Sequence, residues 1–145
     1  SKTSRTPLAG AAPREQLERL ARELAAETGL DATRTGALVD RHGTQAREVV
    51  ELGRAADLLR PLADDRSELE AEVAWAVERE LALSLDDVLS RRMRLSMSRR
   101  DRGASLAPRV AEIAGSRLGW DAQRQATEVE QYLEVARREY DVPGA

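Results

Sequence analysis

The sequence has no cysteine and no phenylalanine, and Lys2 is the only lysine among its 145 residues. Without cysteine there are no disulfide bonds and no thiolate chemistry, which is typical of a cytoplasmic protein. No apolar run approaches the roughly 20 residues that span a bilayer, and no stretch has the pattern of a signal peptide. We therefore expect a cytoplasmic chain.

Residues that most enzymes use are scarce as well. His42 is the single histidine, so a metal site of histidine and cysteine ligands is excluded, and a serine-histidine-aspartate triad would have to use it. It stands beside Gly43 at the end of a predicted helix, where an imidazolium favours the helix C-terminus, and we interpret it as structural. The nine glycines form no GxGxxG or GxxxxGK[ST] phosphate loop. We expect no catalytic, cofactor or metal site in this chain.

The abundant residues are strong helix formers, above all Ala, Leu, Glu, Gln and Arg, with apolar positions at helical spacing. Alternating Val/Ile/Thr runs and hairpin turns are missing. We predict an all-α protein, a single compact domain of about six or seven helices over residues 13–141. Residues 1–12 are predicted to be an extended lead-in or linker, and residues 142–145 a frayed tail. The chain begins with Ser rather than Met, and we expect it to be a fragment.

Local signals predict where the helices begin and end. Side chains that cap a helix N-terminus are predicted at Asp31, Thr44, Ser67, Ser84 and Asp121. Glycines that end a helix are predicted at Gly29, Gly43 and Gly119. One helix is expected over 67–82, where Glu70 completes a capping box, and the next from 84 to Ser96 or Met97. Pro61 must break the helix before it, and Pro108 is tolerated only in the first turn of a helix over 105–118.

Charged residues fall on the apolar faces of two consecutive predicted helices. At 100° per residue, Glu72 and Glu80 share the arc of Val77, and Arg92 lies near the arc of Val88. Burying such charges without a partner costs several kcal/mol each, so we predict a buried carboxylate–arginine pair that locks the two helices together. Contact with a partner domain is a second interpretation, and catalysis by paired carboxylates is a third.

Arginines and tryptophans add further candidates for contact surfaces. A basic stretch comprises Arg91, Arg92, Arg94, Arg99, Arg100 and Arg102. It suits a solvated helix end, a phosphate or lipid surface, or an acidic partner protein. Nucleic acid is disfavoured, because the net charge is −3 and no aromatics are interleaved. Trp75 lies opposite Val77 and needs a cover, and Trp120 is predicted to fill the corner between two helices.

The order of three blocks resembles the C-terminal helical domain of FAD-dependent (aerobic) glycerol-3-phosphate dehydrogenases. The blocks are EVAWAVEREL over 72–81, LDDVLSRRMRL over 85–95 and APRVAEIAGSRLGWD over 107–121. The lead-in RTPLAGA over 5–11 is similar to the segment that leaves the flavin-binding part in that family. Two positions depart from the family pattern: Trp75 stands where Tyr is usual, and Met93 where Thr is usual. The second departure removes a hydroxyl beside the paired arginines.

The resemblance implies a parent enzyme that oxidises sn-glycerol 3-phosphate to dihydroxyacetone phosphate with FAD, passing electrons to a quinone or to oxygen. Flavin and substrate would be bound by preceding domains, and this chain would dock on them without catalysing the reaction. By resemblance, structural or interdomain roles fall on Glu72, Trp75, Glu80, Arg91, Arg92, Trp120 and Asp121. A homodimer and a peripheral position on the inner face of the cytoplasmic membrane stay open. The alternative is a free-standing helical protein–protein interaction module or regulator.

Overall fold

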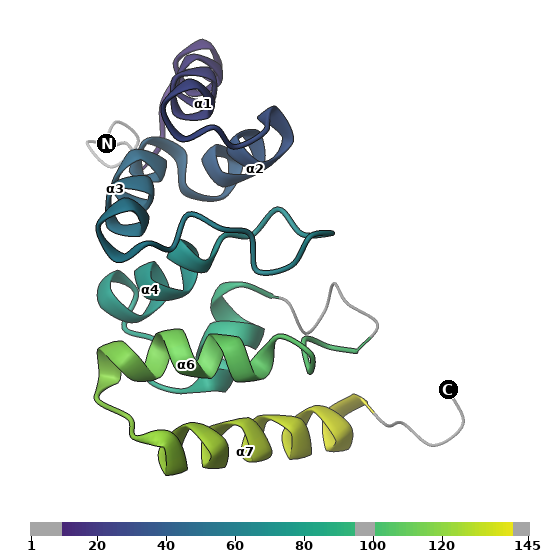
Figure 1. Ribbon diagram of the computed structural model, residues 1–145. Coiled ribbons are helices and arrows are strands. Elements are labelled where there is room, and N and C mark those ends of the chain that lie inside the picture. The colour runs from purple at the N-terminus through teal and green to yellow at the C-terminus, as the bar shows by residue number, and fades with distance from the viewer. Residues whose placement is uncertain (1–9, 95–100, 141–145) are drawn as a thin grey trace, which may run out of the picture. The chain divides into compact units, whose positions relative to one another are not determined.

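The computed structural model describes residues 10–94 and 101–140 and is drawn in Figure 1. Within these ranges there are six α-helices and no β-strand, apart from one isolated bridge between Pro61 and Leu69. The predicted all-α class is confirmed. The chain divides into two compact units, Ser1–Ala71 and Glu72–Ala145, and no change in composition marks this division in the sequence.

The first unit is built on three helices: α1 (Arg14–Thr28), α2 (Ala32–His42) and α3 (Ala46–Ala56). α1 packs mainly against α2, and the short 3-10 turn Gly43–Gln45 leads into α3. Their buried faces carry aliphatic side chains at helical spacing. The buried apolar residues of these helices are Leu24, Leu38, Val39, Ala46, Val49 and Val50.

Two of the predicted helix ends in this unit follow from local chemistry. Gly29 ends α1 in the left-handed conformation, with φ +76°, and its N–H donates to Ala25 O. Asp31 caps α2 by accepting the Arg34 N–H at 2.8 Å. This hydrogen bond lowers the pKa of the Asp31 carboxyl. Both predictions are confirmed, because each depends only on residues within one helical turn.

The predicted cap at Thr44 is wrong. α3 begins at Ala46, and no side chain caps it, because the 3-10 turn occupies residues 43–45. The Thr44 N–H donates instead to Gly10 O at 2.9 Å. Gly10 and Gly43 both have positive φ, and a Cβ at Gly43 would lie 1.9 Å from Gly10 O. The end of the lead-in therefore touches the corner between α2 and α3 so closely that only glycine fits there.

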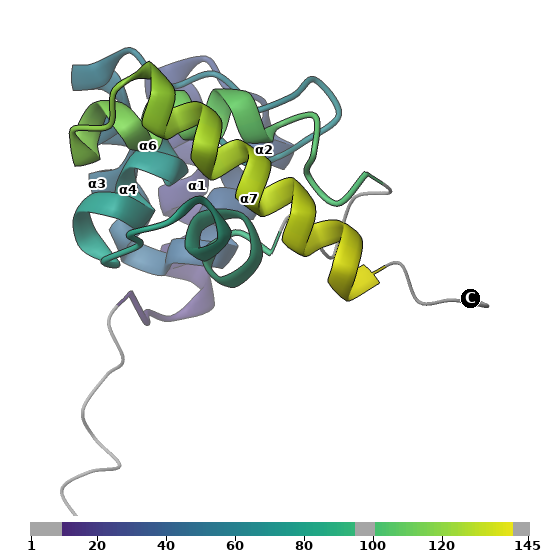
Figure 2. The same cartoon turned by 90° about the horizontal axis from the view of Figure 1, so that it is seen from below.

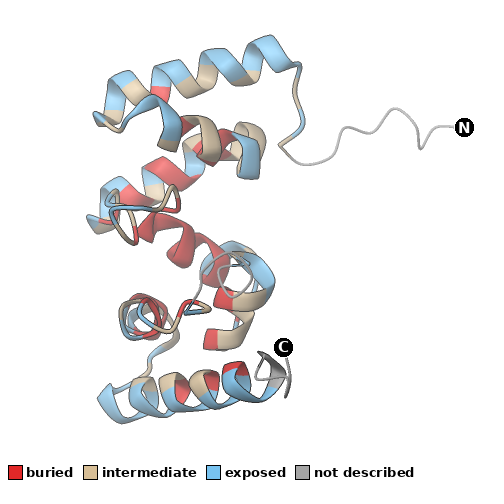
Figure 3. Ribbon diagram, turned by 90° about the vertical axis from the view of Figure 1, so that its right-hand side faces the viewer, coloured by how far each residue is buried: buried red, intermediate tan, exposed pale blue. Residues whose placement is uncertain are grey.

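The predicted helix over 67–82 is also wrong at its start, because α4 (Glu70–Arg79) begins later. The preceding segment is extended and pairs with the chain around Pro61 through backbone bonds. The pairs are Leu62 N–H to Glu68 O, Glu70 N–H to Arg60 O and Ala71 N–H to Leu58 O, each at 2.9 Å. The Arg60 and Leu58 carbonyls accept the first two N–H groups of α4, which is the role expected of the Ser67 cap. Every residue from 68 to 77 is buried (Figure 3).

The second unit contains most of α4, a π-helix η3 (Asp87–Arg92), α6 (Ala107–Leu118) and α7 (Ala122–Tyr140). Figures 1 and 2 show α6 and α7 side by side, joined by a short turn. Gly119 ends α6 with φ +75°, and Pro108 lies in its first turn, as predicted. Ser96, Met97, Arg99, Arg100 and the segments 1–9 and 141–145 lie outside the described residues.

The glycine pair gives a test of the first unit. Gly43→Ala is expected to lower the free energy of unfolding by about 2 kcal/mol or more, because a Cβ at positive φ would meet the Gly10 carbonyl. The matched control is Gly36→Ala in α2, where a Cβ would meet nothing within 4 Å, and it should raise stability by about 0.5–1 kcal/mol. Urea denaturation measures both changes. Equal midpoints would contradict the close contact at Gly43.

Candidate interdomain surface

The buried ion pair predicted between the fourth and fifth helices does not form. Glu72 is buried, but Glu80 is half-buried and follows the last residue of α4, and Arg92 is exposed. The error has a geometric cause. Residues 87–92 form a π-helix, in which Met93 N–H donates to Val88 O at 2.9 Å, five residues back. A wider turn rotates each residue by less than 100°, so a wheel drawn for an α-helix misplaces Arg92.

The arginine that reaches α4 is Arg117 of α6. Its Nε lies 3.1 Å from Oε1 of Glu78, and its side chain is mostly buried. This pair is not the predicted one, because the Glu78 carboxylate is exposed and the arginine belongs to α6 instead of the next helix along the chain. The sequence carries a signal for this pair, because Arg117 lies four residues after the buried Ile113 and shares its side of the helix.

Glu128 of α7 is a buried carboxylate that sequence reasoning missed. It is 6% exposed. Its Oε2 accepts the Leu85 N–H at 3.1 Å, and its Oε1 accepts Nη2 of Arg124 at 2.8 Å. It fixes the chain just before the π-helix. The signal was its position four residues before Tyr132, on the predicted apolar stripe.

Residues 80–94, here called the 80–94 segment, join α4 to the π-helix and continue beyond it. Ser84 caps this element as predicted, because its Oγ accepts the Asp87 N–H at 3.1 Å. The Asp87 carboxylate accepts the Leu83 N–H at 3.2 Å through Oδ2 and lies 3.6 Å from Nη1 of Arg91 through Oδ1. Leu83, Asp87 and Arg91 are thereby linked on one side of the segment.

Two leucines of this segment face solvent, although neither was predicted to lie on a contact surface. Leu81 is 76% and Leu83 is 64% exposed, whereas Ala82 between them is buried. The Ala82 N–H donates to Ala76 O at 3.0 Å, which holds the segment against the end of α4. Leu81 has φ +57°, a left-handed conformation that is costly for a branched side chain. In the sequence, the alternation Leu-Ala-Leu over 81–83 was the signal that could have indicated two leucines on one side and the alanine on the other.

The two tryptophans and Asp121 lie as the sequence suggested. Trp75 is 3% exposed, so its ring is covered, and the Arg79 guanidinium lies 5.6 Å from the ring centre. Trp120 is half-buried at the junction of α6 and α7, where Arg124 lies 5.5 Å from its ring. Asp121 caps α7 by accepting the Arg124 N–H at 2.7 Å, as predicted. The ring of Trp120 and the carboxylate of Asp121 are thus both engaged with Arg124 at the start of α7.

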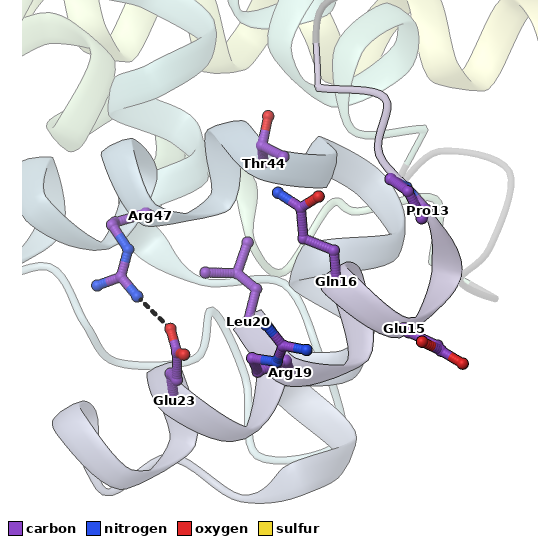
Figure 4. A pocket seen from close by; sticks show the side chains of 8 residues that line it. All are labelled: Pro13, Glu15, Gln16, Arg19, Leu20, Glu23, Thr44 and Arg47. Atoms are coloured by element: carbon purple, nitrogen blue, oxygen red, sulfur yellow. Dashed lines mark hydrogen bonds and ion pairs between the residues drawn. The ribbon is translucent and has the colours of Figure 1, made fainter.

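A hollow in the first unit has no catalytic arrangement. It has a volume of about 550 Å³ and opens between α1 and the turn before α3 (Figure 4). At this hollow the Arg47 guanidinium forms ion pairs with Glu23 at 2.9 Å and with Glu27 at 3.1 Å. The hydrogen bond that the Arg47 guanidinium donates to Glu27 raises the pKa of Arg47, which stays a cation. This trio ties α3 to α1 and leaves no acid–base pair facing the hollow.

The described residues contain no group of three or more metal-binding side chains. None of the helices formed by residues 10–94 and 101–140 is long and apolar enough to cross a membrane.

Comparisons with known proteins decide the family. The family model for the C-terminal domain of alpha-glycerophosphate oxidase matches residues 1–125, a range that covers all seven candidate residues. The chain belongs to this family. It is also similar to glycerol-3-phosphate dehydrogenase 2 of Mycobacterium tuberculosis, with 36% identity over 141 residues, 97% of this chain. A glycerol-3-phosphate dehydrogenase of Mycobacterium leprae is 39% identical over 110 residues, 75% of this chain.

The similarity extends to distant organisms. A mitochondrial glycerol-3-phosphate dehydrogenase of Arabidopsis thaliana is 31% identical over 105 residues, 72% of this chain. In every case the match covers a minor share of the relative: 24% of the Mycobacterium tuberculosis protein, 19% of the Mycobacterium leprae protein and 17% of the plant protein. The chain therefore spans about a quarter or less of the length of these relatives. The predicted family is confirmed.

The cap of α7 gives a second test. Asp121→Ala is expected to lower the free energy of unfolding by about 1 kcal/mol, because the Arg124 N–H loses its acceptor. Asp121→Asn keeps an acceptor oxygen and is the control, with little change expected. Thermal unfolding followed by circular dichroism measures both. A similar loss in the two variants would contradict the capping role.

The corrected ion pair gives a third test. Arg92→Ala should change the free energy of unfolding by no more than about 0.5 kcal/mol, because this side chain is exposed. Arg117→Ala should lower it by about 1–2 kcal/mol, because it removes a mostly buried side chain and its ion pair with Glu78. Chemical denaturation of the two variants compares them directly. A larger loss for Arg92→Ala than for Arg117→Ala would restore the original pairing.

Proposed function

We propose that this chain is the C-terminal helical domain of an FAD-dependent glycerol-3-phosphate dehydrogenase, and that it supports the catalytic domains without catalysing the reaction itself. The observation that carries this proposal is the family match together with its share of the relatives. Proteins named glycerol-3-phosphate dehydrogenase contain this domain within a chain about four times longer. A domain appended to a larger enzyme needs a stable fold and a contact surface.

The chemistry of the described residues agrees with a supporting role. Two of their buried carboxylates hold the fold in place: Glu128 of α7 accepts the Leu85 N–H, and Glu68 pairs with Arg66 at 2.7 Å within the segment before α4. A general acid or base needs a group that is free to exchange its proton with substrate. Glu128 and Glu68 instead serve as fixed acceptors inside the fold.

The described residues do not fit FAD. A dinucleotide is held by a glycine-rich turn that leads from a strand into a helix N-terminus. Among residues 10–94 and 101–140 no strand leads into a helix, and Gly29, Gly43 and Gly119 follow the last turns of α1, α2 and α6 instead of preceding a first turn. We therefore place the flavin and the glycerol 3-phosphate in the preceding part of the parent enzyme. In the parent, FAD would take the two electrons released when the secondary alcohol becomes a ketone.

The proposed partner of this domain is the FAD-binding part of its own chain, and the proposed location is the cytoplasm, at the inner face of the cytoplasmic membrane through the parent enzyme. A second copy of the enzyme is a further proposed partner. These assignments rest on the family, and each concerns the whole protein.

A comparison of the full reading frame with this chain tests the proposal. The full-length protein is expected to purify with flavin absorbance and to reduce a dye with glycerol 3-phosphate. The 145-residue chain should do neither, and adding FAD to it should give no turnover. Flavin spectra and dye-reduction rates are the measurements. Flavin binding or turnover by the short chain, or a reading frame without a flavin domain, would reject the proposal and favour an independent interaction module.

A further inference from the structure

We propose that the 80–94 segment is the surface through which this domain docks on the FAD-binding part of the same chain, with Leu81 and Leu83 as apolar anchors and Arg91 as a charged one. This inference rests on the proposed function and adds the contact residues to it. Three features of the segment support it, namely its exposed leucines, its backbone geometry and its balance of charge.

The two exposed leucines lie on either side of a single alanine. Among the described residues the exposed large apolar side chains are Leu81, Leu83 and, at 37%, Val135. Scattered apolar residues on a surface are ordinary, but two neighbouring leucines exposed by more than half form a patch that a partner can bury. The buried Ala82, with its N–H bonded to Ala76 O, holds both leucines outward. Their exposure is therefore built into the backbone.

The backbone of the segment is unusual at both ends and in its middle. Leu81 and Arg94 have φ of +57° and +53°, a region that costs an L-residue roughly 1–2 kcal/mol. Between them lies the π-helix, a rare form that occurs often at functional sites. Strain of this kind is retained in proteins mainly where it positions a functional group. Here it positions the leucines and the arginines on the outside of the second unit.

Charge argues for a protein partner over a lipid surface. The 80–94 segment contains three acids, Glu80, Asp86 and Asp87, and three arginines, Arg91, Arg92 and Arg94. An anionic bilayer attracts surfaces with net positive charge, and this one is balanced. Arginine, unlike lysine, is enriched at protein interfaces, and every basic residue of the segment is an arginine.

The occupant follows from the relatives. Three quarters or more of each relative lies outside the matched region. In a chain built the same way, that part is tethered to this domain and is present at a high effective concentration, so it meets an apolar patch before any separate protein does. Asp87 contacts both the Leu83 N–H and the Arg91 guanidinium and so keeps these two residues close together. A partner that binds the leucines and Arg91 would have an apolar hollow beside a carboxylate.

The absence of cysteine from this chain makes the contact measurable in the full-length enzyme. Leu83→Cys and Leu81→Cys each place one thiol on the proposed surface, and Glu130→Cys places one on the exposed face of α7 as the control. Alkylation of the native enzyme, read by mass spectrometry of the peptide that carries the new cysteine, gives the rate at each position. Both leucine positions should react at least tenfold more slowly than position 130, without added lipid and independently of enzyme concentration.

Other results would overturn the inference. Reaction at positions 81 and 83 as fast as at position 130 would mean that nothing covers the surface. Protection that appears only with vesicles containing phosphatidylglycerol would assign the surface to a membrane, and protection lost on dilution would assign it to a second copy. The oxidation of glycerol 3-phosphate by the same preparations reports separately on the proposed function. An active enzyme with reactive leucine positions would reject the docking surface alone.

Discussion

The carboxylate of Glu128 holds α7 against the chain at Leu85, and the exposed surface of the 80–94 segment depends on this contact. By accepting the Leu85 N–H, it ties α7 to the first residue after the Ser84 cap, while Arg124 neutralises its other oxygen. A buried acceptor of this kind is costly unless it is satisfied, so the Leu85 N–H is held at this point, two residues before the π-helix begins. Leu83 and Asp87, which carry the proposed contact, lie two residues to either side of Leu85.

Features that depend on neighbouring residues could be predicted from the sequence. The caps at Asp31 and Asp121 and the left-handed glycines at Gly29 and Gly119 each need only one helical turn, and all four are found. The Ser67 cap failed because backbone carbonyls about ten residues earlier supply the acceptors for the start of α4. Nothing near Ser67 in the sequence announces that pairing, because it depends on how the chain folds back at Pro61.

Of the candidate site, the sequence predicted a buried acid on the fourth helix but not the ion pair that this helix makes. Burial of an acid on the fourth helix and a pairing of that helix with an arginine were both expected, and the structure has Glu72 buried and Glu78 paired with Arg117. The expected arginine was wrong because a helical wheel assumes one rotation per residue, and the π-helix changes it. The exposed leucines were missed for a different reason: leucine in a helical sequence is ordinarily assigned to the core.

The corrected position of Arg92 changes what the arginines after the π-helix can do. A buried arginine would have been fixed by its partner inside the domain, whereas an exposed one is available to another surface. Arg91 remains only loosely engaged, since it is 74% exposed and 3.6 Å from Asp87, a pairing that contributes little to stability. Such weak local pairs cost little to rearrange when a partner carboxylate approaches, and they keep the guanidinium oriented until it does. The feature that made the sequence look like a locked helix seam is thus better explained as a surface prepared for contact.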